Sequence, residues 1–233
     1  MKNYAKSILK AGTILKAAIM DRRPNLYYVG GWLGKDNLGD EALFSAYRNL
    51  FPRFCFIHYD GGRLGTGIAR KLSSPRAGIL AGGTLIGQRR NWLNIARSFL
   101  EICPKLLVFG TGVDDPSLWS GETTIEDWIP VLQHCDYIGV RGPQSADLLK
   151  SHGLKQVEIV GDPVLTFAAD HVNRSPVPRT LGLNIGTADG RIWGSEDRVC
   201  EEMAKLAKTA TKAGWSVKWF AVWPKDLEIT RKA

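Results

Sequence analysis

The stretch GGWLGKDNLGDEAL, from Gly30 to Leu43, connects a short apolar segment to a predicted helix. The apolar segment, Leu26–Val29, has the length and composition of a buried strand, and the helix is predicted over Glu41–Leu50. Glycines at positions 30, 31, 34 and 39 permit a tight turn between the two, and Asp40 lies where a helix N-cap is expected. The stretch therefore predicts a strand–loop–helix unit.

The same alternation of apolar segments and amphipathic segments continues along the chain. Strands separated by helices indicate an α/β fold with a parallel sheet that is covered by helices on both faces. The further predicted strands are Phe54–Tyr59, Gly78–Ala81, Leu106–Phe109, Tyr137–Val140 and Val157–Val160, and the further predicted helices are Trp92–Ile102, Thr124–Gln133 and Pro143–Ser151.

The polar stretch DHVNRSPVPRT, residues 170–180, holds two prolines close together and is typical of a linker. After it the alternation restarts with the strand Leu181–Ile185, the helix Glu196–Ala213, the strand Val217–Val222 and a helix that opens at Asp226. A single strand–helix–strand unit buries too little surface to be a stable domain. We therefore expect a fragment with a complete first domain at 23–169 and an incomplete second domain at 181–233.

Residues 1–22 precede the first domain and are predicted to form an amphipathic helix. Tyr4, Ile8, Ala11, Leu15 and Ile19 repeat at three- and four-residue spacing, while lysines occupy the other faces. Two interpretations stay open: a helix that lies on a membrane surface or binds a partner, and a helix packed on the first domain.

The composition excludes several classes of protein. Of the 233 residues, 44% are hydrophobic and 23% are charged, and no apolar run is long enough to cross a bilayer or to act as a secretory signal. The net charge of +8 comes from scattered lysines and arginines, so an anionic small substrate explains it more simply than nucleic acid. The four cysteines (Cys55, Cys103, Cys135 and Cys200) lie far apart, which favours reduced thiols in the cytoplasm over a zinc site or disulfides.

Three glycine-rich segments follow predicted strands: the stretch at 30–43, AGGTLIG at 81–87 and FGTGVDD at 109–115. Ligands of open parallel sheets bind beyond the carboxyl ends of the strands, where glycine lets backbone amides approach an anion. Any one of these turns alone is explained equally well by close packing. The fingerprints of dinucleotide-binding and phosphate-binding loops are absent.

These segments resemble, in order and spacing, the elements of the polysaccharide pyruvyl transferase family. GKDNLGDEAL is similar to the opening N-x-G-D-E-A element, AGGTLIG to the glycine-rich element, and DYIGVRGPQSADLLKSHGL to a strand followed by an arginine and a serine on a helix. VGDPVLTF resembles the G-D-P/A element, and LGLNIG and WPKDLEITRK resemble the start of the second domain. The resemblance covers about residues 26–233.

The resemblance implies a Rossmann-like first domain in a two-domain architecture similar to glycosyltransferase B. It implies transfer of the enolpyruvyl unit of phosphoenolpyruvate to a sugar, which forms a pyruvate ketal in exopolysaccharide or cell-wall glycan synthesis. The expected partners are phosphoenolpyruvate and a saccharide acceptor, with no nucleic acid, cofactor or metal. The expected location is the cytoplasm, with a contact to the inner face of the membrane through the N-terminal helix left open.

Asp40 and Arg141 are the candidate catalytic residues. Arg141 suits a bidentate grip on carboxylate or phosphate, or else forms a salt bridge beside a helix. Asp40 is either a base that contacts a sugar hydroxyl or a helix N-cap. The candidate substrate-binding residues are Asn37, Gly39, Gly82, Gly83, Thr84, Gly110 and Asp162, of which Asp162 could equally cap the turn before Pro163.

In one respect the chain departs from the family pattern, because it ends before a segment with arginine and histidine that the family carries late in its second domain. None of His58, His134, His152 and His171 lies in that context. We therefore expect the chain alone to be inactive. The alternatives are a glycosyltransferase of similar fold and a non-catalytic truncated paralogue.

Overall fold

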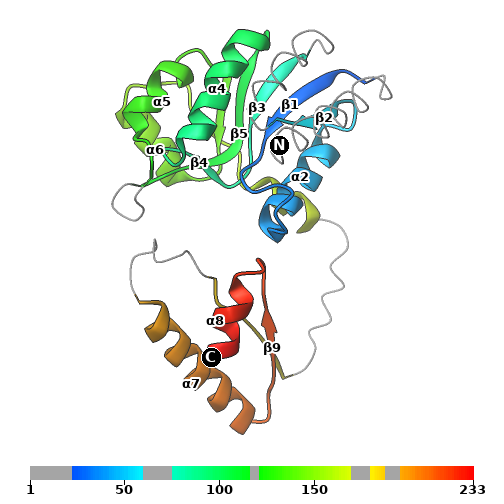
Figure 1. Cartoon of the computed structure of the whole chain (residues 1–233), viewed down its shortest axis with the longest axis vertical. Helices are drawn as coiled ribbons and strands as arrows, with labels where there is room; N and C mark the ends of the chain where they lie inside the picture. Colours follow the sequence, from blue (N-terminus) through cyan, green and yellow to red (C-terminus); the bar gives the residue numbers. More distant parts are fainter. Residues whose placement is uncertain (1–22, 60–74, 116–120, 169–178, 187–194) are drawn as a thin grey trace, which may run out of the picture.

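The computed structural model describes residues 23–59, 75–115, 121–168, 179–186 and 195–233. The predicted N-terminal helix and most of the predicted linker lie outside these residues. The described residues form two units: a main unit up to residue 168 and a C-terminal unit from residue 179 (Figure 1).

The main unit is built on a seven-stranded sheet in which all the hydrogen-bonded strand pairs are parallel. The strands run in the order β2-β1-β3-β5-β6-β7, and β4 pairs with the end of β5. The predicted α/β fold with a parallel sheet is confirmed. The strands are β1 (Asn25–Val29), β2 (Cys55–His58), β3 (Ala77–Leu80), β4 (Thr84–Ile86), β5 (Leu106–Val113), β6 (Tyr137–Val140) and β7 (Glu158–Ile159).

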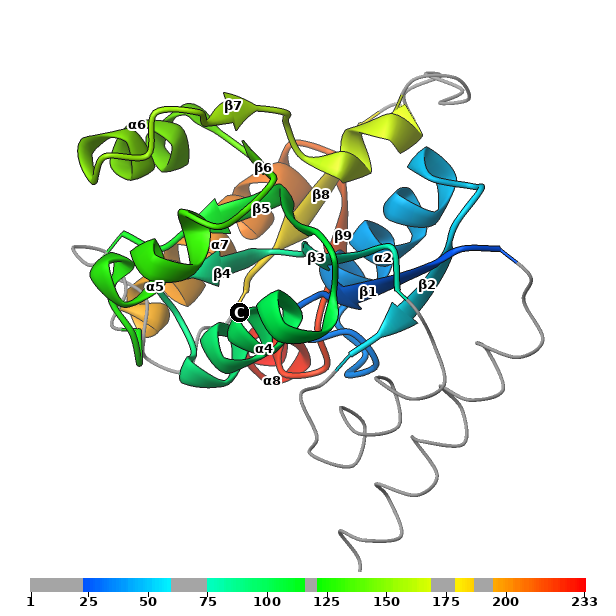
Figure 2. The same cartoon turned by 90° about the horizontal axis from the view of Figure 1, so that it is seen from above.

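Helices cover both faces of this sheet because successive residues of a buried strand point to opposite faces (Figure 2). On one face Tyr27 and Val29 of β1 share a core with α4 (Arg90–Ile102), α5 (Ile125–Leu132) and α6 (Pro143–Ser151). On the other face Leu26 and Tyr28 share a core with α2 (Leu38–Leu50) and the short 3-10 helix η1 (Pro163–Ala168).

The C-terminal unit contains a separate parallel pair of strands, β8 (Thr180–Asn184) and β9 (Ser216–Phe220). Its helices are α7 (Glu196–Lys212) and α8 (Asp226–Lys232). Ile185, Cys200 and Ile229 form its small core. The restart of the strand–helix pattern predicted after the linker is thus present as a sheet of its own.

Two elements of the main unit were not predicted from the sequence, β4 and η1. The residues of β4 lie in the predicted glycine-rich loop, and those of η1 follow the last predicted strand of the first domain. The pairing of β4 is possible because β5 extends four residues past its predicted end at Phe109, so that Thr84 lies opposite Gly112. Both elements are short and are held by tertiary contacts rather than by a periodic apolar pattern.

Candidate functional site

The candidate site lies where the turns after β1 and β3 meet. These two strands are neighbours, and the chain leaves β1 toward β2 on one side while β3 and β5 lie on the other. In open α/β sheets such a reversal of strand order opens a crevice at the carboxyl ends of the strands. The turns pack closely here: a Cβ atom on Gly82 would lie 3.0 Å from Cα of Gly30.

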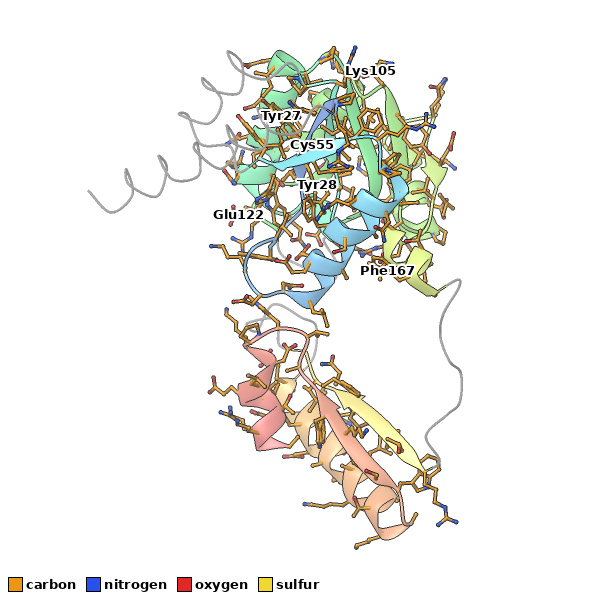
Figure 3. The ribbon with its side chains drawn as sticks, turned by 90° about the vertical axis from the view of Figure 1, so that its right-hand side faces the viewer. Tyr27, Tyr28, Cys55, Lys105, Glu122 and Phe167 are labelled. Carbon is orange, nitrogen blue, oxygen red and sulfur yellow. The ribbon has the colours of Figure 1, made fainter. Side chains whose placement is uncertain are left out.

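These carboxyl ends lie at the end of the main unit that faces the C-terminal unit. Figure 3 shows Lys105, beside the amino end of β5, at the far end of the main unit, and Phe167 of η1 at the end nearer the C-terminal unit. The three glycine-rich segments therefore gather on one side of the molecule.

Asp40 joins the two turns through its carboxylate. The side chain is only 6% exposed, and Oδ2 accepts the backbone N–H of Trp32 at 3.2 Å, while the backbone N–H of Gly83 also donates to the carboxylate. Burial raises the pKa of Asp40, and the two amide bonds and the positive charge of Arg141 only partly oppose this. The result is a carboxyl group that holds its proton more firmly than an exposed aspartate does.

The expectation that Asp40 is the N-cap of α2 is wrong. The N-cap is Asn37, whose side-chain oxygen accepts the backbone N–H of Asp40 at 3.1 Å. Both residue types favour caps, and helix α2 starts three residues earlier than predicted because Asn37 takes this position. Gly39 is exposed in the first turn of α2, where an added Cβ would meet the Asn37 side chain at 3.2 Å.

Arg141 follows β6 and lies between two other predicted site residues. Nη1 is 3.4 Å from Oδ2 of Asp162, and Nη2 donates to Oγ1 of Thr84 at 3.3 Å. A Cβ on Gly112 would lie 3.1 Å from Nη2, so glycine leaves room for the guanidinium. Asp162 also accepts the N–H of Val164 at 3.0 Å and so caps η1, while its contact to a substrate stays a prediction.

Gly110 and Tyr47 complete this edge. Gly110 has φ of +71°, and an added Cβ would lie 2.4 Å from Cγ of Pro163 and 2.8 Å from the Tyr47 hydroxyl. That hydroxyl donates to the carbonyl of Phe109 and receives the N–H of Gly82. Tyr47 was missed in the sequence, although it lies seven residues after Asp40 and so on the same face of α2.

Two further hydroxyl groups hold the backbone around the candidate site in place through hydrogen bonds. Thr111 is fully buried, and its Oγ1 donates to the carbonyl of Gly83 at 2.7 Å. Ser145 of α6 accepts the N–H of Val113 at 3.0 Å, which fastens α6 to β5. These two bonds hold the turn after β3 and the end of β5 in place.

The family model for polysaccharide pyruvyl transferase matches residues 37–231, which is more than half of the chain. The chain belongs to the polysaccharide pyruvyl transferase family. No curated protein gives a significant match. Membership in the polysaccharide pyruvyl transferase family indicates a transferase that acts on a saccharide.

All the predicted site residues of this pyruvyl transferase family member lie along the carboxyl edge of the main sheet. Asn37, Gly39 and Asp40 lie in the first turn of α2, Gly82, Gly83 and Thr84 in the turn after β3, Gly110 within β5, Arg141 after β6 and Asp162 after β7. Among the described residues no cluster of His, Cys, Asp and Glu could hold a metal ion. Within the same residues, no helix has the length and apolar character of a membrane span.

Proposed function

We propose that the protein transfers the enolpyruvyl unit of phosphoenolpyruvate to two hydroxyl groups of a saccharide, which forms a pyruvate ketal and releases phosphate. The observation that carries the proposal is the position of Arg141, which lies between Thr84 and Asp162 at the carboxyl edge of the sheet. Its charge also acts on Asp40. Family membership supports the transferase class and the saccharide acceptor.

Arg141 is suited to hold one anionic group of phosphoenolpyruvate. Its side chain is 34% exposed, and the guanidinium has five N–H donors, more than its two bonds to Thr84 and Asp162 use. The fork geometry of arginine matches a carboxylate or a phosphate. The positive charge of Arg141 also favours the binding of an anion next to the buried side chain of Asp40.

Asp40 is proposed as the acid that acts on the enol carbon. The reaction adds one proton to the methylene carbon of phosphoenolpyruvate, and one sugar hydroxyl adds to C2. The second hydroxyl then displaces the phosphate at C2, so that of the two hydroxyl protons lost, one is gained by carbon and the other leaves with the phosphate. A carboxyl group whose pKa is raised by burial is suited to both giving and receiving such a proton.

The wider arrangement follows from the same proposal. The main unit and the C-terminal unit are proposed as a Rossmann-like first domain and part of a second domain of a glycosyltransferase-B-like architecture, with the acceptor between them. The proposed location is the cytoplasm. The family match does not favour the glycosyltransferase alternative.

The test measures binding of phosphoenolpyruvate and release of phosphate with a panel of saccharides. Arg141→Ala should weaken phosphoenolpyruvate binding by about 1.5–3 kcal/mol, since a hydrogen bond to a charged group is lost, and Arg141→Lys should recover only part. Arg48→Ala is the matched control. It also removes one positive charge, but from the last turn of α2, at the end of this helix opposite to Asp40. Equal binding in Arg141→Ala and the control would remove Arg141 from the site.

A further inference from the structure

The loop between β1 and α2 is tied to the first turn of α2 by two carboxylates. Asp40 accepts the N–H of Trp32 at 3.2 Å, and Glu41 accepts the N–H of Gly34 at 2.7 Å. Within the loop, the N–H of Leu33 donates to Gly30 and closes a turn around these residues. The backbone of Trp32 and the carboxylate of Asp40 are therefore joined directly by a hydrogen bond.

The side chain of Trp32 lies at the contact between the two units. Its ring centroid is 6.2 Å from that of Trp223, which belongs to the C-terminal unit, and the rings are inclined by 33°. The guanidinium carbon of Arg89 lies 4.6 Å from the Trp32 ring centroid, and Nζ of Lys225 lies 4.8 Å from the Trp223 ring centroid. A cation thus lies against each tryptophan ring from within its own unit, which helps to hold each ring in place.

The turn that carries Trp223 is held by hydrogen bonds within the C-terminal unit. Asp226 is 2% exposed, and its Oδ2 accepts the N–H groups of Val222 and Trp223 at 3.2 and 3.0 Å. The carbonyl of Val222 in turn accepts the N–H of Leu38, the first residue of α2, at 2.9 Å. The first N–H groups of a helix have no partner within the helix, so the C-terminal unit supplies one here.

We propose that Trp32 is a positioning residue that couples the placement of the C-terminal unit to the geometry of Asp40. The coupling runs from Trp223 through the Trp32 ring to the Trp32 amide, which donates to the Asp40 carboxylate. A second connection runs from Val222 to Leu38, two residues before Asp40. The inference rests on the proposed role of Asp40 in the site.

The coupling has a chemical consequence for the proposed reaction. The Trp32 amide stabilises the carboxylate form of Asp40, so its loss leaves the group more firmly protonated and less well oriented. The acid is therefore in its working geometry only while the two units are in contact. Proton transfer is therefore restricted to the state in which the two units are in contact, and this contact also protects the enol from water.

The test is backbone hydrogen exchange across residues 30–40 and 82–84 without any substrate. In Trp223→Ala we expect exchange of these amides to become about two- to tenfold faster, as the loss of one aromatic pair allows. The matched control is Trp215→Ala, which removes a tryptophan that is 44% exposed in the same C-terminal unit. The control should leave exchange at 30–40 and 82–84 unchanged.

Unchanged exchange in Trp223→Ala, or an equal increase in Trp215→Ala, would overturn the coupling. Trp223→Phe retains an aromatic ring and should give an intermediate rate, which guards against a variant that merely unfolds. In a chain that turns over phosphoenolpyruvate, Trp223→Ala should lower kcat and leave phosphoenolpyruvate binding unchanged, because the Arg141 contacts all lie in the main unit. Exchange is measured without turnover, so a failure of the proposed reaction remains distinguishable from a failure of the coupling.

Discussion

The hydroxyl of Tyr47 in α2 donates a hydrogen bond to the backbone carbonyl of Phe109 in β5, 62 residues further along the chain. The same oxygen accepts the N–H of Gly82 after β3. Burial raises the pKa of Tyr47, so the hydroxyl keeps its proton and donates at neutral pH. One side chain thus holds a helix and the ends of two strands in a fixed relation beneath the candidate site.

Tyr47→Phe should destabilise the protein because both backbone partners stay buried and lose their bond. We expect the free energy of unfolding to fall by about 1–3 kcal/mol in urea denaturation. Tyr28→Phe is the matched control, since the Tyr28 hydroxyl is buried without a hydrogen-bond partner among the described residues. That control should be neutral or stabilising, and an equal loss in both variants would show that the Tyr47 bonds contribute nothing specific.

Gly110→Ala should be among the most damaging small substitutions in the main unit. It combines a φ of +71° with a Cβ that would lie 2.4 Å from Pro163, so both backbone strain and a collision oppose it. Gly34→Ala isolates the first effect, because Gly34 has φ of +73° and no atom within 4 Å of the added Cβ. We expect about 1–2 kcal/mol for Gly34→Ala and clearly more for Gly110→Ala, measured by thermal unfolding.

Asn37 can be assigned to a structural or a substrate-binding role by substitution with other cap residues. Asn37→Ala should cost about 1 kcal/mol of stability because the N–H of Asp40 loses its partner. Asn37→Ser keeps a capping oxygen and should retain stability. If Asn37→Ser also retains phosphoenolpyruvate-dependent activity, the residue acts only as the N-cap, whereas a selective loss of activity would place it at the substrate.

Asp114, at the end of β5, should make the protein less stable as the pH rises. Burial, and then the neighbouring Asp115, raise the pKa of this carboxyl from 3.8 to about 6. The folded state therefore binds more protons than the unfolded state between about pH 4 and 6, and stability falls through this window by on the order of 2 kcal/mol. Asp114→Asn should be more stable than the wild type at pH 7 and equal to it near pH 3.5.

The measurement for Asp114 is urea denaturation at a series of pH values. Asp40 contributes a slope of the same sign, since burial also raises its pKa, and this part should remain in Asp114→Asn. Asp147→Asn replaces an exposed acid on α6 and serves as the control. An identical pH slope in wild type and Asp114→Asn would contradict the prediction.

The strands and helices of the main unit were predictable because each buried strand is a short apolar run that ends at glycine or polar residues. The short strand β4 was not, since Thr84–Ile86 has no pattern of its own and pairs only because β5 extends beyond Phe109. Its stability comes from a distant partner, which a local pattern cannot reveal.

The candidate site was predictable where a residue type implied chemistry, as for Asp40 and Arg141, and less so where several residues could take one role. Asn37 and Asp40 both belong to residue types that commonly form N-caps, and the sequence does not show which of the two caps α2. The structure shows that α2 begins at Leu38, so Asn37 is the N-cap. Tyr47 belongs to an apolar helix face and was indistinguishable from a core aromatic. The contact of Trp32 with Trp223 depends on how the chain returns after the linker, which no local signal specifies.

The parallel pairing of the main sheet has a consequence for synthesis on the ribosome. β1 pairs with β2 and β3, and β3 begins only at Ala77, so β1 leaves the ribosome long before its second neighbour exists. Tyr47 must likewise wait until Phe109 has been made. Contacts of such long sequence separation close slowly. The nascent chain therefore exposes the apolar strand β1 until β3 has been made, and transiently exposed apolar surface of this kind is what chaperones bind.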